Sequence, residues 1–491
     1  MRILIPDTWH FHRRNFAPLY DHLAAAQVPF DVERTRRAWW KSHGDYGRFA
    51  RRLRHHVERL NPLSPSELVA SQHNDISLMA VVRSEFLCRA LPRWIAGAGP
   101  RDDLALAERA LGNETDRSEL LLCFAAAIDW IDFWRSKLDR TPAFTHVLVF
   151  SGSYIYTRAL QEVAQRRGLR IFTLESFFTG NDFYFEERAT AISNRSQLSV
   201  PDYYRRLVLP DERDQLDRWR AEAQTRFRAK RNKNVRASPS AVVAPPFRAA
   251  DRGAILVLGQ VLNDFSVIET PLPEMSTIAV YRRLIGALLE KTDRNVIFKA
   301  HPWERRRPNL RSPVTLKQMT VWREALPDRQ RERFRVLEAE PLSGLFPYVD
   351  HAIGLSSQGL IEAAQAGLKP IQLGDAFFGG HGFTHDRTLD DALIDDIAAG
   401  RLASRLSLAE YRALEDFLVR SLVLHLVSDR PEGPEKIAIR LREPGHTPNL
   451  EEARFTEGEA RRAWTALVAE MIANPFGFHR IVRPSRWFRR S

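Results

Sequence analysis

The feature that most constrains the fold of this chain is a series of short, continuous apolar runs that alternate with helical patterns. The run His146–Phe150 (HVLVF) is followed by a turn, an amphipathic segment at 155–167, Gly168 and a second apolar run at 170–174 (RIFTL). Continuous runs of β-branched and aromatic residues are typical of strands covered on both faces, as in parallel sheets. The order strand, helix, strand therefore predicts a βαβ unit.

The same alternation starts again in the second half of the chain. Apolar runs at 254–258 (AILVL), 295–299 (NVIFK), 334–337 (FRVL), 350–354 (DHAIG) and 369–373 (KPIQL) are separated by helical or polar segments. This succession predicts a second, doubly wound sheet.

Composition shifts divide the chain into parts. Helical patterns fill about 45–140, and a charged, Ser/Ala/Pro-rich linker lies at about 225–252. We expect a Rossmann-like N-terminal domain at 1–240 with a helical insertion at about 45–140. A second Rossmann-like domain should cover 253–404, and helices with a basic-aromatic tail should cover 405–491.

Charge and cysteine content limit the partners and the compartment. The net charge is +12, from 73 Lys+Arg against 61 Asp+Glu, which indicates an anionic partner or a solvated arginine-rich face. No nucleic-acid-binding motif is present, so we expect no nucleic-acid partner. Cys88 and Cys123 lie in apolar contexts typical of buried thiols in a reducing compartment.

Localisation follows from the apolar pattern. No signal peptide or run of about 18 apolar residues is present, so we expect a cytoplasmic protein. The tail at 476–490 (FGFHRIVRPSRWFRR) mixes aromatic side chains with arginines. It either lies peripherally on the anionic inner membrane or docks as a terminal helix on the first domain.

Candidate functional residues follow the predicted strands, where ligands bind in parallel sheets. After 254–258 comes GQVLNDFS, in which Gly259 permits a tight exit and Gln260 supplies an amide. Asp264 of this loop is either a nucleophile or stabiliser of an oxocarbenium-like centre, or a residue that caps a short helix.

Two further loops carry groups that bind phosphate. KAHPWE (299–304) offers Lys299 and His301 as donors on a turn stiffened by proline, although a lone histidine is often structural. SSQGLIEAAQAG places Ser356 and Ser357 at a helix start, where they bind an anion, cap the helix, or divide these tasks.

The loop GDAFFGGHGFTHD (374–386) combines four glycines, three aromatic residues and two histidines. This composition predicts a mobile loop that closes over a ligand. His381 and His385 have the spacing of metal ligands on a helix, but the glycines disfavour that helix, so we expect no metal site.

Glu175 lies at the end of the strand 170–174, in an aromatic setting. Partial burial would raise its pKa towards that of a general acid, unless the residue is a structural partner of an arginine. If the two domains face each other, Asp264 and Glu175 form a two-carboxylate site across the cleft.

Together these motifs resemble the capsule polysaccharide biosynthesis and export family, the bacterial retaining β-Kdo glycosyltransferases. The resemblance is carried by GQVLNDFS, the His-Pro of KAHPWE, SSQGLIEAAQAG, FFGGHGFTHD and, upstream, FSGSYIYTRALQEVAQRRGLRIFTLESFF. The aromatic segment NDFYFE is closer to the lipid-linker-initiating branch. The chain departs from the family pattern at Ala300, usually Pro, at His381, often aromatic, and at ATAISN (189–194).

The resemblance implies an α/β GT-B fold, with two Rossmann-like domains facing across a cleft and with helical additions. It implies an acceptor domain at 1–240, a donor domain at 253–404, and transfer of Kdo from CMP-Kdo, with retention, to a lipid-linked or saccharide acceptor. Asp264 is then the nucleophile and Glu175 the acid/base, and His301 with Ser356 and Ser357 grips the CMP. The CMP-sugar is a co-substrate, and no cofactor is expected.

The full set of expected donor-binding residues is Gly259, Gln260, Ser266, Lys299, His301, Pro302, Ser356, Ser357, Gln358, Gly359, Glu362, Gly379, His381 and Thr384. The alternatives are a GT-B-shaped nucleotide-diphosphate-sugar transferase or epimerase, and a non-catalytic scaffold of the polysaccharide export machinery.

Overall fold

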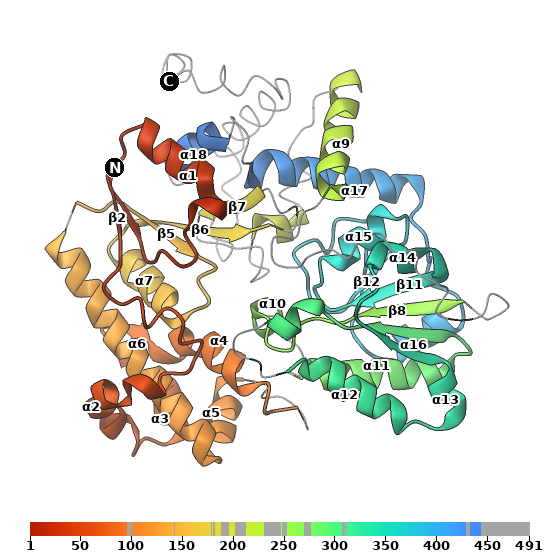
Figure 1. Ribbon diagram of the computed structural model, residues 1–491, viewed down its shortest axis with the longest axis horizontal. Helices are drawn as coiled ribbons and strands as arrows, with labels where there is room; N and C mark the ends of the chain where they lie inside the picture. The colour runs from red at the N-terminus through yellow and green to blue at the C-terminus, as the bar shows by residue number, and fades with distance from the viewer. Residues whose placement is uncertain are drawn as a thin grey trace. The chain divides into compact units, whose positions relative to one another are not determined.

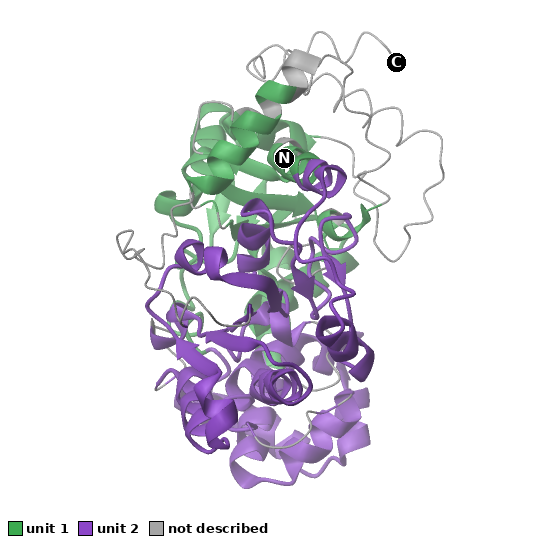
Figure 2. Ribbon diagram, turned by 90° about the vertical axis from the view of Figure 1, so that its right-hand side faces the viewer, with its two compact units in different colours: residues 1–42, 127–232, 415–491 green, residues 43–126, 233–414 purple. Residues whose placement is uncertain are grey.

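In the computed structural model, the chain forms two compact units that interleave along the sequence. The first unit contains residues 1–42, 127–232 and 415–491, and the second contains residues 43–126 and 233–414 (Figure 2). The residues described are 1–95, 100, 102–141, 143–177, 179, 182–187, 196–201, 213–229, 247, 253–269, 276–306, 310, 312–428 and 433–442.

The first unit is built on a six-stranded sheet with the strand order β14-β7-β6-β5-β1-β2 (Figure 1). Strands β2, β1, β5 and β6 are parallel, whereas β7 runs antiparallel to both of its neighbours. The predicted βαβ unit is confirmed, because β5 and β6 pair in parallel from His146 opposite Arg170 to Phe150 opposite Leu174.

Helices cover both faces of this sheet. Figure 1 shows α1 and α18 on one face and α6 and α7 on the other. Phe16 and Leu19 of α1 and Ile437 of α18 pack with Leu148 and Leu174 of the strands in one buried cluster. Burial of such side chains is the main source of stability, at about 1.5–3 kcal/mol for each fully buried apolar side chain.

The elements of the first unit are β1 (Ile3–Ile5), α1 (Arg13–Ala25), β2 (Phe30–Val32), α6 (Glu114–Arg140, which begins in the second unit), β5 (His146–Phe150), α7 (Ile155–Arg166), β6 (Arg170–Ser176), β7 (Asp182–Glu187), α9 (Arg213–Arg228), α17 (Leu408–Arg420, which also begins in the second unit), β14 (Leu426–Ser428) and α18 (Gly433–Arg442).

The second unit contains a six-stranded sheet in which every pairing is parallel, with the order β10-β9-β8-β11-β12-β13. The chain starts at β8 in the middle, moves outward through β9 and β10, and returns to the other side of β8 with β11. This is the predicted doubly wound topology, and it confirms the α/β fold class with two Rossmann-like sheets. Figure 1 shows α11 and α12 on one face and α14 and α15 on the other.

The elements of the second unit are α2 (Ala50–Leu60), α3 (Pro65–Ala70), β3 (Gln72–His73), β4 (Ile76–Ser77), α4 (Leu78–Ala90), α5 (Asp103–Leu111), β8 (Ala254–Leu258), α10 (Phe265–Ile268), α11 (Thr277–Lys291), β9 (Asn295–Lys299), α12 (Val314–Glu324), α13 (Asp328–Glu332), β10 (Phe334–Leu337), α14 (Leu342–Leu345), β11 (Val349–Gly354), α15 (Gly359–Gln365), β12 (Ile371–Gln372), β13 (His385–Asp386) and α16 (Asp391–Ala398).

The helical segment at 43–126 groups with the second sheet, although the sequence placed the insertion at about 45–140 in the N-terminal domain. Hydrogen bonds from α4 to the segment after β8 explain this grouping. Ser84 donates to the Glu269 carboxylate at 2.6 Å, and Asn263 donates to the Cys88 carbonyl at 2.8 Å. These contacts lie far apart in sequence, and a pattern of local apolar spacing does not reveal them.

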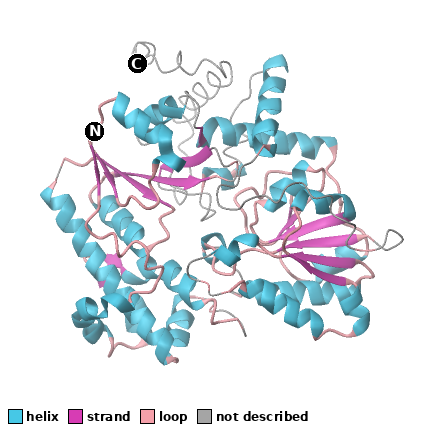
Figure 3. Cartoon of the chain, viewed as in Figure 1, coloured by secondary structure: helices cyan, strands magenta, loops and turns pink. Residues whose placement is uncertain are grey.

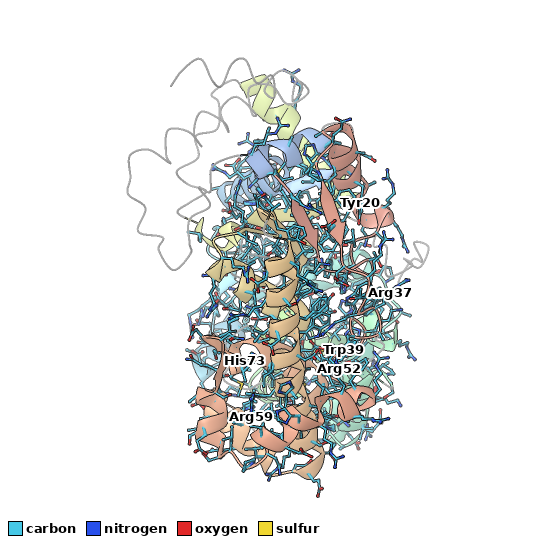
Figure 4. The ribbon with its side chains drawn as sticks, turned by 90° about the vertical axis from the view of Figure 1, so that its left-hand side faces the viewer. Tyr20, Arg37, Trp39, Arg52, Arg59 and His73 are labelled. Atoms are coloured by element: carbon cyan, nitrogen blue, oxygen red, sulfur yellow. The ribbon has the colours of Figure 1, made fainter. Side chains whose placement is uncertain are left out.

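Many arginines of the helical segment face solvent. Arg52 and Arg59 of α2 are both exposed and are labelled in Figure 4, while Leu53 and Leu60 of the same helix are buried. Such a solvated face accounts for part of the basic charge without requiring an anionic partner. Figure 3 shows the helices, strands and loops of the described residues.

Several predictions concern residues outside the described ranges. They are most of the linker at about 225–252, the segment ATAISN at 189–194 and the basic-aromatic tail at 476–490. That the two domains face each other across a cleft stays a prediction. Cys88 and Cys123 are buried free thiols, as predicted. No helix within the described ranges is both long enough and apolar enough to cross a membrane.

Candidate functional site

The candidate site lies at the crossover point of the second sheet, between the central strands β8 and β11, where the order of the strands reverses. The loops that leave their carboxyl ends meet at Gln260 and Ser356. The Gln260 side chain donates to the hydroxyls of Ser266 at 2.7 Å and Ser356 at 3.0 Å, and its Oε1 accepts the Ser356 backbone N–H at 3.2 Å. The backbone N–H of Gln260 donates to the Tyr281 hydroxyl at 2.8 Å. Such a crossover point is where doubly wound sheets bind their ligands.

Gly259 joins a third loop to this point. Its backbone N–H donates to the Lys299 carbonyl at 2.8 Å, which holds the end of β9 against the start of the loop. A Cβ atom at Gly259 would lie 2.7 Å from Phe298 Cζ and 2.9 Å from the Lys299 carbonyl oxygen. Only glycine fits there, as the sequence predicted for a tight exit. The loops after β8, β9 and β11 therefore converge on Gly259 and Gln260.

Asp264 is the N-cap of the four-residue helix α10, one of the two roles considered from the sequence. Its Oδ1 accepts hydrogen bonds from the backbone N–H and the hydroxyl of Ser266, both at 3.1 Å. The side chain is half-buried. Ser266 thus links Asp264 to Gln260, so the carboxylate belongs to the same network as the strand-end loops.

Asn263, next to Asp264, is fully buried and has a structural task. Its side-chain amide donates to the Cys88 carbonyl at 2.8 Å, and the Cys88 thiol donates to the Asn263 carbonyl at 3.5 Å. The reciprocal pair fastens the loop to α4, so the helical segment fixes the position of Asp264.

Lys299 is buried at the end of β9. Its Nζ donates to the Glu338 carbonyl at 2.7 Å and to the Ala300 carbonyl at 3.2 Å. Burial lowers the pKa of Lys299, against the opposing effect of the carboxylates of Glu340, Glu338 and Glu362. Two of its three N–H donors are therefore directed at backbone oxygens.

His301 accepts the backbone N–H of Trp303 at Nδ1, at 3.2 Å, so its ring proton lies on Nε2. Pro302 starts the short 3₁₀ turn Pro302–Arg306. Within that turn Glu304 is buried and accepts from the backbone N–H and hydroxyl of Thr315 at 2.9 and 2.7 Å. Burial raises the pKa of Glu304 above its ordinary value.

Arg305, in the same turn, pairs with Glu338. Its Nε and Nη2 donate to the two carboxylate oxygens, each at 2.6 Å. The pair is largely exposed on the arginine side. An ion pair with one exposed partner contributes about 0–1 kcal/mol to stability.

The two serines after β11 have different partners, and their binding of an anion stays a prediction. Ser356 is buried and bonds to Gln260, whereas the Ser357 hydroxyl accepts the Gly359 backbone N–H at 3.3 Å, and Gln358 is the N-cap of α15. A Cβ at Gly359 would lie 3.0 Å from Leu342 Cδ1, so this turn also favours glycine. Gln358 precedes the helix and Glu362 follows one turn later, both half-buried.

Hydrogen bonds to Asp386 hold the base of the loop at 374–386, and closure of this loop over a ligand stays a prediction. Asp386 accepts hydrogen bonds from the Gly380 backbone N–H and the Thr384 hydroxyl, both at 2.7 Å, and from the Gln372 amide at 2.9 Å. A Cβ at Gly379 would lie 2.8 Å from that amide nitrogen. The Thr384 hydroxyl is therefore engaged within the loop.

The two histidines of this loop have different surroundings. His385 Nε2 lies 2.9 Å from the Ala403 carbonyl, and burial lowers the pKa of this ring. His381 is half-buried between Gly380 and Gly382, which both have positive φ. The segment is therefore not a helix, and the helical arrangement considered for metal ligands does not occur. Within the described part of the chain, no group of three or more His, Cys, Asp or Glu side chains could hold a metal ion.

Comparison with known proteins gives fold similarity only. No protein-family model and no curated protein matches the chain. Among solved structures, Thermosulfurimonas dismutans KpsC, beta Kdo 2,4 transferase, is 18% identical, with a TM-score of 0.38 over 56% of this chain and 78% of that one. The beta Kdo 2,7 transferase of the same KpsC is 16% identical, with a TM-score of 0.38 over 62% and 87%.

The Streptomyces nogalater glycosyltransferase SnogD is 12% identical, with a TM-score of 0.24 over 86% of this chain and 95% of that one. Two Rossmann-like α/β units in one chain correspond to the predicted GT-B class. Similarity at this level assigns no activity to the chain.

Glu175, the second predicted carboxylate, lies near the end of β6 in the first unit. It is 2% exposed, and its strand is paired on both sides, with Glu175 opposite Tyr184 of β7. The sequence predicted partial burial, and the structure buries this residue almost completely.

A cluster at the corresponding crossover point of the first sheet, between β1 and β5, was not predicted from the sequence. Asp7, after β1, is fully buried and accepts the Tyr156 hydroxyl at 2.8 Å, and His10 Nδ1 lies 2.9 Å from that hydroxyl. The signal in the sequence was an acid and a histidine three residues apart directly after a strand. Tyr156 could not be connected to them, because it lies 146 residues from His10.

Proposed function

We propose that this protein is a glycosyltransferase that uses a CMP-activated acidic sugar, CMP-Kdo, and that it acts with retention on a lipid-linked or saccharide acceptor in surface polysaccharide assembly. The observation that best supports the proposal is the convergence of three strand-end loops on Gly259 and Gln260. These loops carry the Gln-x-x-x-Asp, Lys-x-His-Pro and Ser-Ser motifs on which the family resemblance rests.

In this proposal the second unit binds the nucleotide. His301 donates from Nε2, and Arg305, whose side chain is largely exposed, can exchange the Glu338 carboxylate for a phosphate oxygen. Lys299 adds positive charge near the ends of the strands while its N–H groups hold the backbone. The buried network of Gln260 and Ser356 keeps the loops in place, so that binding does not have to order them.

Asp264 is the proposed nucleophile. Its carboxylate attacks the anomeric carbon, the bond to the phosphate oxygen breaks, and CMP leaves with the electron pair. The Ser266 N–H and hydroxyl that bind Asp264 orient the carboxylate for attack. An acceptor hydroxyl then attacks the same carbon and releases Asp264. Two inversions give net retention.

The second step also needs a general base for the proton of the acceptor hydroxyl, and the family resemblance implies Glu175 for this role. A lipid-linked acceptor fits the basic-aromatic tail at 476–490, which lies outside the described residues. Binding of this tail to an anionic membrane surface is part of the proposal.

A thermal-shift screen tests the donor class. CMP and CMP-Kdo are expected to stabilise the protein, and UDP and UDP-glucose are not. The variants Gln260→Ala and His301→Ala should lose the CMP shift, whereas Gln330→Ala, in the same unit and outside the site, should keep it. Stabilisation by UDP-sugars and none by CMP would refute the donor assignment in favour of a nucleotide-diphosphate-sugar enzyme.

An activity measurement separates an enzyme from a scaffold. Wild-type protein should release CMP from CMP-Kdo, and Asp264→Asn should bind CMP and release none. Full CMP release by Asp264→Asn would refute the nucleophile. Binding of CMP without any turnover by the wild type, with every acceptor offered, would favour the scaffold interpretation.

A further inference from the structure

The crossover point of the first sheet holds a histidine whose orientation is fixed from two sides. His10 lies in the loop after β1, and its ring stacks on Phe150 at the end of β5, with a centroid distance of 4.4 Å and an interplanar angle of 3°. Tyr20, labelled in Figure 4, donates to the carbonyl of Phe11 at 2.7 Å and holds the same loop against α1. The imidazole therefore has little freedom to rotate.

A buried carboxylate binds the inner side of this loop. Asp7 Oδ1 accepts the backbone N–H groups of Trp9 at 2.9 Å and His10 at 2.6 Å. Burial alone would raise the pKa of Asp7, but the His10 ring and N–H and the Tyr156 hydroxyl outweigh burial, and the pKa is lowered. Asp7 is therefore a carboxylate at neutral pH and can only accept hydrogen bonds.

The hydrogen bonds determine which nitrogen of His10 carries the proton. Tyr156 has one hydroxyl proton, which it donates to Asp7 Oδ2 at 2.8 Å. The Tyr156 oxygen then accepts from His10 Nδ1 at 2.9 Å, and Asp7 Oδ2 also lies 3.4 Å from Nδ1. Nδ1 is thus protonated, and Nε2 presents its lone pair.

A small part of the His10 side chain reaches the surface. The side chain is 12% exposed, and Nε2 makes no hydrogen bond with the residues that the structure describes. An Asp-oriented imidazole with a protonated Nδ1 and an accessible Nε2 lone pair is the arrangement of a general base.

Two buried hydroxyls occur in the neighbouring loop after β5. Ser151 is 4% exposed and Ser153 is 1% exposed, and the Oγ atom of each has no hydrogen-bond partner among the described residues. Buried hydroxyls in folded proteins are nearly always paired, whereas these two keep a donor and acceptor capacity that no described residue uses. A polyhydroxyl compound supplies both donors and acceptors for them.

We propose that the crossover point of the first sheet binds a sugar-like acceptor and that His10 Nε2 takes the proton of its attacking hydroxyl, with Asp7 and Tyr156 as positioning residues. The inference rests on the proposed glycosyl transfer and assigns to His10 the step for which the resemblance implies Glu175. The acceptor oxygen bonds to the anomeric carbon, the bond to the leaving oxygen breaks, and the acceptor proton passes to Nε2 and then to solvent.

The test uses the full-length protein and two nucleophiles that differ in one property. Water must lose a proton when it attacks a sugar, whereas azide carries no proton and needs no base. Donor turnover is followed as nucleotide release, and the glycosyl azide is detected by mass spectrometry. The donor is CMP-Kdo or, if the wild type does not turn it over, UDP-glucose.

His10→Gln is expected to lower hydrolysis by about 10²–10⁴-fold, the usual contribution of a general base, and azide should restore nucleotide release and yield the glycosyl azide. Tyr156→Phe should show a smaller loss that azide also restores. His12→Gln, in the same loop, is the matched control and should retain wild-type hydrolysis. Unchanged nucleotide binding and thermal unfolding show that the variants are folded.

Three results would overturn the inference. They are hydrolysis by His10→Gln at the level of His12→Gln, a loss that azide does not restore, and azide rescue of Glu175→Gln in place of His10→Gln. Turnover of UDP-glucose but not CMP-Kdo refutes the proposed donor and leaves the His10 measurement intact. A wild type that turns over neither donor refutes both proposals.

Discussion

Gln260 and Ser356 are joined by two hydrogen bonds that run in opposite directions across the crossover point of the second sheet. The Gln260 amide donates to the Ser356 hydroxyl at 3.0 Å, and the Ser356 backbone N–H donates to the Gln260 Oε1 at 3.2 Å. The Gln260 side chain thus connects the ends of two strands through hydrogen bonds between residues that are 96 positions apart in the chain. Because both residues are buried, neither group can turn to water instead.

Gln260→Ala should therefore destabilise the second unit. The substitution leaves the buried Ser356 N–H without a partner, which typically costs about 1–3 kcal/mol. Urea unfolding measures the difference, with Gln330→Ala as the control. Equal stability of the two variants would mean that the loops are held together by other contacts.

Gly259→Ala and Gly286→Ala make the same chemical change with opposite expected results. At Gly259 the new methyl group would lie 2.9 Å from the Lys299 backbone oxygen, so overpacking should cost about 1–3 kcal/mol. At Gly286, inside α11, the nearest atom outside the helix is Trp322 Cζ2 at 3.9 Å. Alanine there should add up to about 1 kcal/mol through helix propensity. Thermal unfolding of the pair checks both signs.

Features that depend on residues close together in the sequence could be predicted, whereas contacts between distant residues could not. The strand AILVL is identified by its own side chains, and the structure places β8 at the same residues, 254–258. The sequence left two roles open for Asp264, because a capping residue and a nucleophile have the same local pattern. The hydrogen bond between Asn263 and Cys88 joins residues that are 175 positions apart in the chain, and no local spacing of apolar residues predicts it.

Asn263→Ala tests whether the helical segment supports the candidate site. The change removes the donor to the buried Cys88 carbonyl and should cost about 1–3 kcal/mol. Amides of α4 and of the loop at 259–266 are expected to exchange faster with deuterium, whereas those of α16 should keep their protection. Faster exchange confined to the loop would show that α4 is held independently of Asn263.

Asp386→Ala should release the glycine-rich loop. Three donors lose their shared acceptor, namely the Gly380 N–H, the Thr384 hydroxyl and the Gln372 amide. Limited proteolysis is expected to cut the variant within 374–386 faster than the wild type. The control is Asp395→Ala on α16, which removes an exposed contact to Lys291 and should leave the cleavage rate of the loop unchanged.

The pH dependence of stability in the first unit should carry the signature of Asp7. Because the folded-state pKa of Asp7 is lowered, its charged form stabilises the folded state. That contribution is present above the pKa of Asp7 in the unfolded chain, about 3.9, and is lost as the pH falls through the lower folded-state value.

Asp7→Asn should therefore be less stable than the wild type at pH 7, by about 1–3 kcal/mol for the hydrogen bonds that it weakens, and this difference should shrink below about pH 4. Urea unfolding at pH 7, 5 and 3, followed by tryptophan fluorescence, measures the difference. A gap that widens on acidification would mean that Asp7 is protonated in the folded protein, and His10 would then lack the carboxylate that orients it.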